Sequence, residues 1–295
     1  MNIVDLVVPT IAQGLLWSIL ALGVFLTYRV LDIADLTVEG SFPLGAAVAA
    51  SMLTSGYDPY VSIVVAAFAG MLAGVVTGIL TTKLKIPALL AGILTMIALY
   101  SVNLRIMGKA NLSLLRVDTI FSLASFISDD RSMVALVVGL VAVALVVVAN
   151  YWFFGTEIGA AVRATGDNPN MIRANGIDTD ATVILGLLLS NALVAVSGAL
   201  IGQDNGFADV GMGTGTIVIG LASVIVGEVL FGTRNFMNWL ISVVLGSIAY
   251  RVVIAIVLQM GMPPNDLKLF TAVLVAIALV MPLIKKKFKA NREVA

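Results

Sequence analysis

The chain has 295 residues, of which 60% are hydrophobic and 12% charged, and its mean hydropathy is +1.08. A soluble domain has about 45–50% apolar and about 25% charged residues. The composition therefore excludes an ordinary soluble globule and indicates that apolar side chains face lipid. Cysteine and histidine are both absent from the sequence, which excludes disulfides, thiolate nucleophiles, Cys/His zinc sites and histidine proton relays.

Apolar segments follow one another along the whole chain. A bilayer core requires about 20 apolar residues in a helix, and on that criterion the sequence predicts an all-α integral membrane protein with about nine transmembrane helices. The predicted spans are residues 6–28, 41–55, 60–82, 87–107, 133–154, 179–202, 215–232, 236–257 and 267–284. The first lacks a preceding basic region, so we interpret it as a retained span rather than a cleaved signal. The second is short, and we expect a broken or re-entrant stretch before it.

The basic residues predict the orientation, because cytoplasmic loops carry an excess of lysine and arginine. The C-terminal tail is strongly basic, so we place it in the cytoplasm and work back span by span. The predicted inside residues are Arg29, Lys83, Lys85, Arg163, Arg173, Arg234, Lys285, Lys286, Lys287, Lys289 and Arg292. The predicted outside residues are Lys109, Arg116, Arg131 and Lys268. This pattern predicts a multi-pass protein of a bacterial cytoplasmic (inner) membrane, with its C-terminus cytoplasmic and its N-terminus outside.

Residues 108–132 form a long predicted outside segment that mixes apolar and charged residues. Two interpretations are equally compatible with it. The segment forms a short helix lying at the outer interface, or it is a loop packed on the helix bundle.

The two halves of the chain resemble each other in the order of their features. Asp35 and Asp209 each follow an alanine and precede an apolar span, and Pro87 and the Pro263-Pro264 pair each precede a later span. The charge pattern places the first member of each pair inside and the second outside. Inverted repeats with broken helices at matching positions are typical of transporters. We predict a single 1–295 permease domain with repeat units at about 31–107 and 203–284, although a chance resemblance of short Ala-Asp strings stays open.

The longest predicted inside connection, residues 155–177, has the signals of two short helices. Thr156 is a suitable N-cap with Glu157 in the first turn, and we expect Gly166 to end this helix in the left-handed conformation. Asn168 then caps a second helix with Pro169 at its first position, and Gly176 ends it. An interfacial hairpin whose arginines meet lipid phosphate explains the same signals, but two capped helices suit the docking of a soluble partner.

The string GAAVRATGDNP at 159–169, followed by ANGI at 174–177, resembles the coupling-helix loop of ABC importer permeases. The closest group is the branched-chain amino acid and monosaccharide permease superfamily, and within it a group associated with tryptophan or tyrosine uptake. The segment DLTVEGS at 35–41 is similar to the break before the second span there, but it inserts Glu39 before the glycine. The resemblance covers about residues 30–284.

This resemblance implies a transport subunit that is not an enzyme and that forms a dimer, most simply of two identical copies. Cytoplasmic ATPase subunits dock on the coupling loops, and an extracytoplasmic substrate-binding protein docks on the outer face. The implied ATPase contacts are Glu157, Arg163, Ala164, Thr165, Gly166, Asp167, Asn168, Pro169, Arg173 and Gly176. The implied breaks at 35–43 and 205–215 border the translocation path, through Asp35, Thr37, Glu39, Ser41, Phe42, Asn205, Phe207, Asp209 and Met212.

The sequence contains no phosphate-binding loop of the Walker type, so ATP with its magnesium ion is expected on the partner ATPase and no cofactor on this chain. No nucleic-acid partner is expected. The apolar and aromatic residues near the breaks favour an amino acid, aromatic in the group that this sequence resembles, over a sugar. An ion-coupled secondary transporter is the alternative, because it also uses inverted repeats.

Other polar and small residues in the spans have packing explanations. Glu228 is expected at the inner interface beside Arg234, and Asn103 and Asn191 are expected to form hydrogen bonds between helices. Gly70, Gly74 and Gly78 form a ridge of small residues on the third span. Such a ridge permits close approach of another helix, either within the chain or across a dimer.

Overall fold

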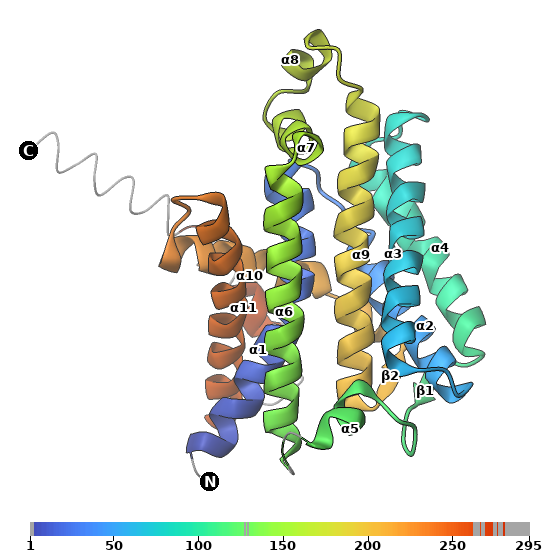
Figure 1. Cartoon of the computed structure of the whole chain (residues 1–295), viewed down its shortest axis with the longest axis vertical. Helices are drawn as coiled ribbons and strands as arrows, with labels where there is room; N and C mark the ends of the chain where they lie inside the picture. The colour runs from blue at the N-terminus through green and yellow to red at the C-terminus, as the bar shows by residue number, and fades with distance from the viewer. Residues whose placement is uncertain are drawn as a thin grey trace, which may run out of the picture.

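The computed structural model describes residues 3–126, 128, 130–261, 266, 269–273, 276 and 280, with side chains from Val7 onward. Long helices form an elongated bundle (Figure 1). The long elements are α1 (Ile3–Phe25) continued by the π-helical turn η1 (Leu26–Val30), α2 (Val38–Thr54), α3 (Pro59–Thr82), α4 (Ala88–Met107), α6 (Arg131–Gly155), α9 (Thr179–Asn205), α10 (Thr216–Phe231) and α11 (Phe236–Gln259). The short ones are β1 (Asn111–Ser113), α5 (Ile120–Leu123), η2 (Ala124–Phe126), α7 (Glu157–Asp167), α8 (Pro169–Ala174), β2 (Phe207–Asp209) and η3 (Val210–Gly213).

Seven helical segments in the described part of the chain are long and apolar enough to cross a membrane. They correspond to seven of the nine predicted spans, and their ends lie within a few residues of the predicted ones. The second predicted span is also a helix, α2, but it has only 17 residues. The predicted span 267–284 lies largely outside the described residues. The chain is therefore mostly helical and multi-pass.

Helix α9 forms the centre of the bundle, and α6 lies at its margin. The apolar stretch of α9 is 67% buried, whereas that of α6 is 22% buried. The buried face of α9 packs against α1, α2 and α3, and large apolar side chains on the outer faces of α3 and α6 are exposed, such as Phe68, Leu72 and Leu145. In a bilayer these outward side chains contact lipid, so their exposure agrees with the composition.

Glycines allow α9 to pack closely against α2 and α3. A Cβ on Gly70 would lie 2.3 Å from the Asn191 carbonyl oxygen, and one on Gly74 would lie 2.3 Å from that of Leu187. On α2, a Cβ on Gly45 would lie 1.9 Å from the Ala195 oxygen. The small-residue ridge of the third span therefore packs within this chain, as small residues do at close helix contacts.

Two segments that are not α-helical interrupt the bundle. The first break, residues 31–37, lies between η1 and α2, and the second break, residues 206–215, lies between α9 and α10. Ser41 and Phe42 were predicted within the first break, but both lie in α2, which begins at Val38. The Thr37 N–H, at the start of the helix, donates to the Asp35 carboxylate at 2.9 Å. This contact lets the helix start earlier than the sequence pattern indicates.

The two ends of the bundle carry different structures. Helices α7 and α8 extend beyond one end, whereas α5, β1 and β2 lie at the opposite end (Figure 1). Strand β1 pairs antiparallel with β2, with Leu112 opposite Ala208. The sequence did not predict this pairing, because strands of three residues are too short to show an alternating pattern.

The described residues of the 108–132 segment form a short helix and pack on the bundle. Thr119 caps the short helix α5 by accepting from the Ser122 N–H at 3.2 Å. The segment also packs on the bundle, because Leu114 and Phe121 are buried and the Ile120 N–H donates to Gln203 Oε1 at 3.0 Å.

Candidate functional site

The two breaks meet inside the bundle although they are far apart in sequence. The Glu39 carboxylate, in the first turn of α2, accepts a hydrogen bond from the Gly215 N–H at 3.0 Å. Gly215 is the N-cap of α10 and has a φ of +84°, a conformation that favours glycine. A Cβ on Gly213 would lie 2.0 Å from the Glu39 carbonyl oxygen. The starts of α2 and α10 are thus in direct contact.

A cavity of about 450 Å³ lies beside this contact, between α2, α4 and the second break. Its described lining residues are Glu39, Gly40, Pro43, Met96, Ile97, Tyr100, Ser101, Asn103, Val210, Gly211 and Thr214. Most of these side chains are apolar or aromatic, and Glu39 is the one ionisable acid among them. We call this space the Glu39 cavity.

Asn103 is fully buried in the wall of the Glu39 cavity. Its Nδ2 donates to the Gly40 carbonyl oxygen at 3.3 Å, as expected for a hydrogen bond between helices. Its Oδ1 is buried and has no hydrogen-bond partner within the described residues. Buried polar atoms in native structures almost always have a partner, and Asn103 Oδ1 and Arg251 Nε are the two buried side-chain atoms of the described residues that have none.

A second cavity of about 300 Å³ lies on the other side of Thr214 and Gly215. It is lined by Val218, Ile219, Tyr250, Arg251, Ile254, Thr271 and Ala272 as well as by those two residues. The Arg251 guanidinium lies over the Trp17 ring, with its Cζ 4.2 Å from the ring centre. Cation–π contact of this kind offsets part of the cost of placing the arginine among apolar helices.

Four of the residues predicted for the first break face the core. Asp35 is buried, and it accepts from the Thr37 N–H and from Asn191 Nδ2, the latter at 2.8 Å. Ser41 Oγ donates to Asn191 Oδ1 at 2.6 Å. Phe42 stacks on Trp17 with ring centres 5.2 Å apart. These residues join the first break to α1 and α9, whereas Glu39 alone of the predicted first-break residues lines a cavity.

The residues predicted for the second break lie in different surroundings. Asn205 and Phe207 are exposed at the end of the bundle that carries β1 and β2. Asp209 accepts from the Gly211 N–H at 2.7 Å and from Asn111 Nδ2 at 3.3 Å. Met212 packs partly buried against the apolar core. None of these four lines the Glu39 cavity.

The sequence analysis missed several residues of this cavity, above all Tyr100 and Thr214. A signal existed for one wall: Met96, Tyr100 and Asn103 are spaced at three and four residues and therefore share a face of α4. Thr214 has no comparable signal, because its position follows from the irregular backbone of the second break.

The 155–177 loop folds as two capped helices. Thr156 Oγ1 accepts from the Gly159 N–H at 3.2 Å to cap α7, and Asn168 Oδ1 accepts from the Met171 N–H at 3.0 Å to cap α8. Gly176, with a φ of +81°, follows the end of α8. Of these local predictions the one for Gly166 is wrong. Helix α7 runs through Gly166 to Asp167, and the two helices join at Asn168.

Gly166 has a packing role instead of a capping role. A Cβ there would lie 2.0 Å from the Val30 carbonyl oxygen, so α7 packs directly on the backbone of η1. On the same helix, Thr165 is buried and its Oγ1 lies 2.8 Å from Thr182 Oγ1 of α9. Helix α7 is therefore fastened to two of the bundle helices.

The predicted docking residues differ in exposure. Arg163, Ala164 and Gly166 are half-buried and Thr165 is buried, whereas the others are exposed: Glu157, Asp167, Asn168, Pro169, Arg173 and Gly176. Ile158 and Met171 add large exposed apolar side chains to α7 and α8. The loop thus combines a fastened inner face with an outer face of mixed polar and apolar character.

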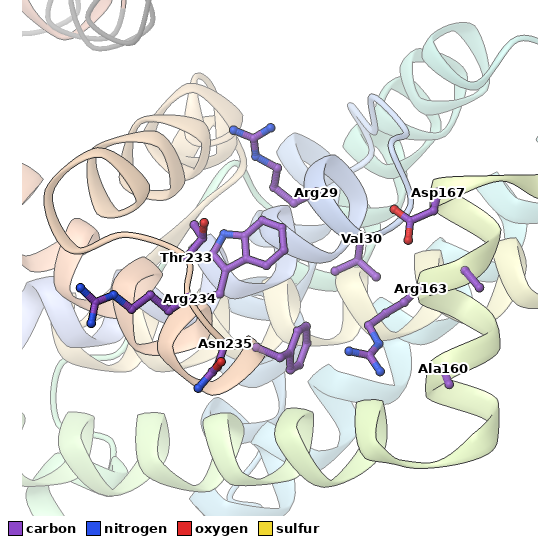
Figure 2. A pocket seen from close by; sticks show the side chains of 11 residues that line it. Arg29, Val30, Ala160, Arg163, Asp167, Thr233, Arg234 and Asn235 are labelled. Atoms are coloured by element: carbon purple, nitrogen blue, oxygen red, sulfur yellow. The ribbon is translucent and has the colours of Figure 1, made fainter. Parts of the chain in front are cut away.

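A pocket of about 480 Å³ separates α7 from the α10–α11 connection. Figure 2 shows Arg29, Arg163 and Arg234 around it, from η1, α7 and that connection. The Arg163 guanidinium lies over the Phe236 ring, with its Cζ 5.1 Å from the ring centre. Glu228 was expected beside Arg234, but it pairs with Arg29, because the end of η1 lies next to the end of α10.

Basic residues gather at this end of the bundle. Lys83, Lys85 and Arg173 all lie near the Asp180 carboxylate, at 3.3, 3.7 and 3.7 Å. At the opposite end, the Arg131 guanidinium donates to the Asp204 carbonyl oxygen. The basic residues that the charge pattern places inside therefore lie at one end of the bundle. Arg131, which the charge pattern places outside, lies at the opposite end.

Comparisons with known proteins agree with this arrangement. The family described as "Branched-chain amino acid transport system / permease component" matches residues 6–280. A tyrosine transport system permease protein of Clostridioides difficile is 40% identical over 269 residues, covering 91% of this chain and 88% of the relative. An uncharacterized protein of Rickettsia prowazekii is 32% identical over 279 residues, covering 93% and 97%.

A more distant relative is the autoinducer 2 import system permease protein LsrC of Yersinia pseudotuberculosis. It is 27% identical over 230 residues, covering 75% of this chain and 62% of the relative. No solved structure matches the chain. Given the family match over nearly the whole length, the chain belongs to the branched-chain amino acid transport system permease family, the membrane-spanning permease components of ABC-type transporters.

Proposed function

We propose that this permease moves an amino acid with an aromatic side chain into the cell, as one of two identical permease subunits of an ABC importer. The tyrosine transport permease among its relatives supports an aromatic substrate. The apolar and aromatic wall of the Glu39 cavity supports it as well, because such walls match an aromatic side chain better than a sugar.

The observation that carries the proposal is the fastened 155–177 loop. A loop that only connects two spans has no need of two capped helices held to α9 and η1 by Thr165 and Gly166. A rigid element of this kind can transmit force from a soluble subunit to the helices beneath it. We therefore propose that a cytoplasmic ABC ATPase, which holds ATP and its magnesium ion, docks on the residues predicted for this purpose from Glu157 to Gly176.

The proposed topology has nine spans in a single 1–295 domain, with the loop and the C-terminus in the cytoplasm and the N-terminus outside. The gathering of basic residues around α7 and α8 supports this orientation. An extracytoplasmic substrate-binding protein then docks at the end that carries α5, β1 and β2. The contact between the two breaks supports two repeat units that run in opposite directions through the membrane around one translocation path.

In the proposed mechanism, ATP binding closes the two ATPase subunits and moves both 155–177 loops. The motion passes from α7 through Gly166 to η1 and the first break, and from there to the start of α2. The Glu39 cavity lies next to the start of α2. The same motion therefore changes the side of the membrane to which the cavity opens. The permease thus works by alternating access, and a second permease chain completes the translocation path.

A reconstitution experiment tests the proposal. The permease and its cognate ABC ATPase are purified together, and uptake of radiolabelled tyrosine into proteoliposomes is measured with ATP and the binding protein. We expect Arg173→Glu combined with Arg163→Glu to prevent co-purification of the ATPase. Arg116→Glu, at the opposite end, serves as the matched control and should leave it unchanged.

Deleting residues 163–176 should abolish transport and leave membrane insertion intact. Transport that survives this deletion would contradict the docking assignment. Uptake by the permease alone, driven by a sodium or proton gradient, would instead establish the ion-coupled alternative.

A further inference from the structure

A groove of about 790 Å³ lies between the end of α6 and the start of α11. Its described lining residues are Val148, Tyr151, Trp152, Phe154, Gly155, Thr156, Arg163, Asn235, Phe236 and Met237. We call it the α6 groove. Most of this wall is apolar or aromatic, so in a bilayer the groove favours hydrocarbon over water.

The α6 side of this groove faces lipid. Val141, Leu145, Val148 and Trp152 are exposed and spaced by four, three and four residues, so they share one face of the helix. Tyr151 and Trp152 are both exposed and lie near the end of α6. Aromatic residues of this kind mark the level where hydrocarbon meets headgroups. A lipid chain beside α6 therefore has its headgroup near the end of this helix.

The α6 groove is continuous with the pocket between α7 and the α10–α11 connection, because both are lined by Arg163, Asn235 and Phe236. Figure 2 shows the Arg163 side chain extending from α7 toward that connection. Its guanidinium contacts the Phe236 ring and forms no ion pair with any described residue. A guanidinium has five N–H donors and no acceptor, so Arg163 has donors for an anion.

The other charged side chains leave this junction positive. Arg29 is offset by its pair with Glu228, whereas Arg234 lines the pocket and forms no ion pair within the described part of the chain. Asp167 is the one acid among the described lining residues of the two cavities, and it lines the pocket but not the groove. Arg163 lines both, so the positive charge lies where the groove begins.

We propose that this junction binds an anionic phospholipid, with its phosphate on Arg163 and Asn235 and an acyl chain in the α6 groove. A guanidinium binds phosphate through two parallel N–H donors, and the Asn235 amide supplies a further donor. Helix α11 begins at Phe236 without a side-chain capping bond from Asn235, and its partial positive charge adds to the attraction. Basic pockets between spans at headgroup level suit acidic headgroups.

This site goes beyond the proposed function and does not depend on which solute is transported. A lipid bound there fills the space between α7 and the α10–α11 connection. It thereby supports the 155–177 loop from the membrane side.

The tryptophans of the chain provide the readout. There are three: Trp152 lines the groove, Trp239 lines the pocket, and Trp17 stacks on Phe42 in the core. The full-length chain is reconstituted in phosphatidylcholine vesicles that contain either brominated phosphatidylglycerol or brominated phosphatidylcholine. Bromine on an acyl chain quenches a tryptophan that it touches. We expect phosphatidylglycerol to be preferred at the site about fivefold or more, the effect of one or two basic residues at an anionic headgroup.

Four variants assign this preference to the junction. Arg163→Gln should reduce it to about twofold or less, and Arg234→Gln should reduce it in part. Trp152→Phe should remove the selective quenching, because that tryptophan lines the groove. Lys83→Gln is the matched control: it removes one positive charge at the same end of the bundle, lines neither cavity, and should keep the wild-type preference. The preference is a ratio of two lipids for the same variant, so it does not depend on the yield of folded protein.

Equal quenching by the two brominated lipids in the wild type would overturn the site and leave Arg163 to the docked ATPase. A preference that Arg163→Gln leaves unchanged would overturn it as well. Inorganic phosphate added to the vesicles should not displace the lipid, and displacement would show a site for free phosphate instead. The measurement involves neither transport nor the ATPase, so its failure would leave the proposed function as it stands.

Discussion

Arg29 and Glu228 form a two-point ion pair between the end of η1 and the end of α10. Arg29 Nε donates to Glu228 Oε1 at 2.7 Å, and the second guanidinium nitrogen donates to Oε2. Trp239 Nε1 of α11 donates to the same carboxylate at 2.9 Å. One carboxylate thus joins three helical segments directly beneath α7, at the end where we propose that the ATPase docks.

Loss of this ion pair should loosen that end of the bundle. The two side chains are 38% and 13% exposed, and two-point pairs of arginine with carboxylate are the stronger kind. We expect Arg29→Met and Glu228→Gln to show a coupling energy of about 1 kcal/mol in a double-mutant cycle of thermal unfolding in detergent. The more exposed Lys83–Asp180 pair should show a smaller one, and equal values for the two pairs would contradict the prediction.

Close packing of α2 on α9 should depend on Gly45. A Cβ at this position would lie 1.9 Å from the Ala195 carbonyl oxygen, so Gly45→Ala forces the helices apart. We expect it to lower the apparent free energy of unfolding by about 1–3 kcal/mol, as overpacking does. Gly155→Ala is the control, since nothing lies within 4 Å of its Cβ position, and it should be near neutral. The measurement is thermal unfolding in detergent.

The polar network around Asn191 should be costly to interrupt. Asn191 donates to Asp35 and accepts from Ser41, and all three side chains are buried. Asn191→Leu leaves the Asp35 carboxylate without that donor, so we expect a loss of about 3 kcal/mol or more, which lowers the yield of folded protein. Combining it with Asp35→Asn should restore part of the stability. If Asn191→Leu folds like the wild type, the network is not required for stability.

The contact between Gly166 and η1 should matter for coupling more than for assembly. Gly166→Ala pushes α7 away from the Val30 carbonyl oxygen, 2.0 Å from the added Cβ. We expect the ATPase still to co-purify, while ATP-driven uptake falls at least tenfold because motion of α7 no longer reaches the first break. Gly155→Ala is the control, since Gly155 is the last residue of α6, outside the proposed docking residues, and nothing lies within 4 Å of its Cβ position. Normal uptake with Gly166→Ala would contradict this route.

The sequence by itself determined the membrane class and the helix positions, because both depend on local properties. Runs of apolar residues must form helices in lipid, where every backbone polar group needs a partner within the segment. The caps at Thr156 and Asn168 were likewise readable, since a cap involves residues only three positions apart. The docking role of the loop, the inverted repeat and the translocation path stay predictions.

The tertiary structure alone decided which residues line a cavity and which are packing. Asp35, Thr37, Ser41 and Phe42 share the first break with Glu39 in sequence, yet they face the core. Gly166 resembles a helix terminator in sequence, yet it is a contact point with Val30. The physical reason is the same in each case. A side chain's role in a helix bundle depends on the partner that lies across from it, and for Glu39 that partner is Gly215, 176 residues away.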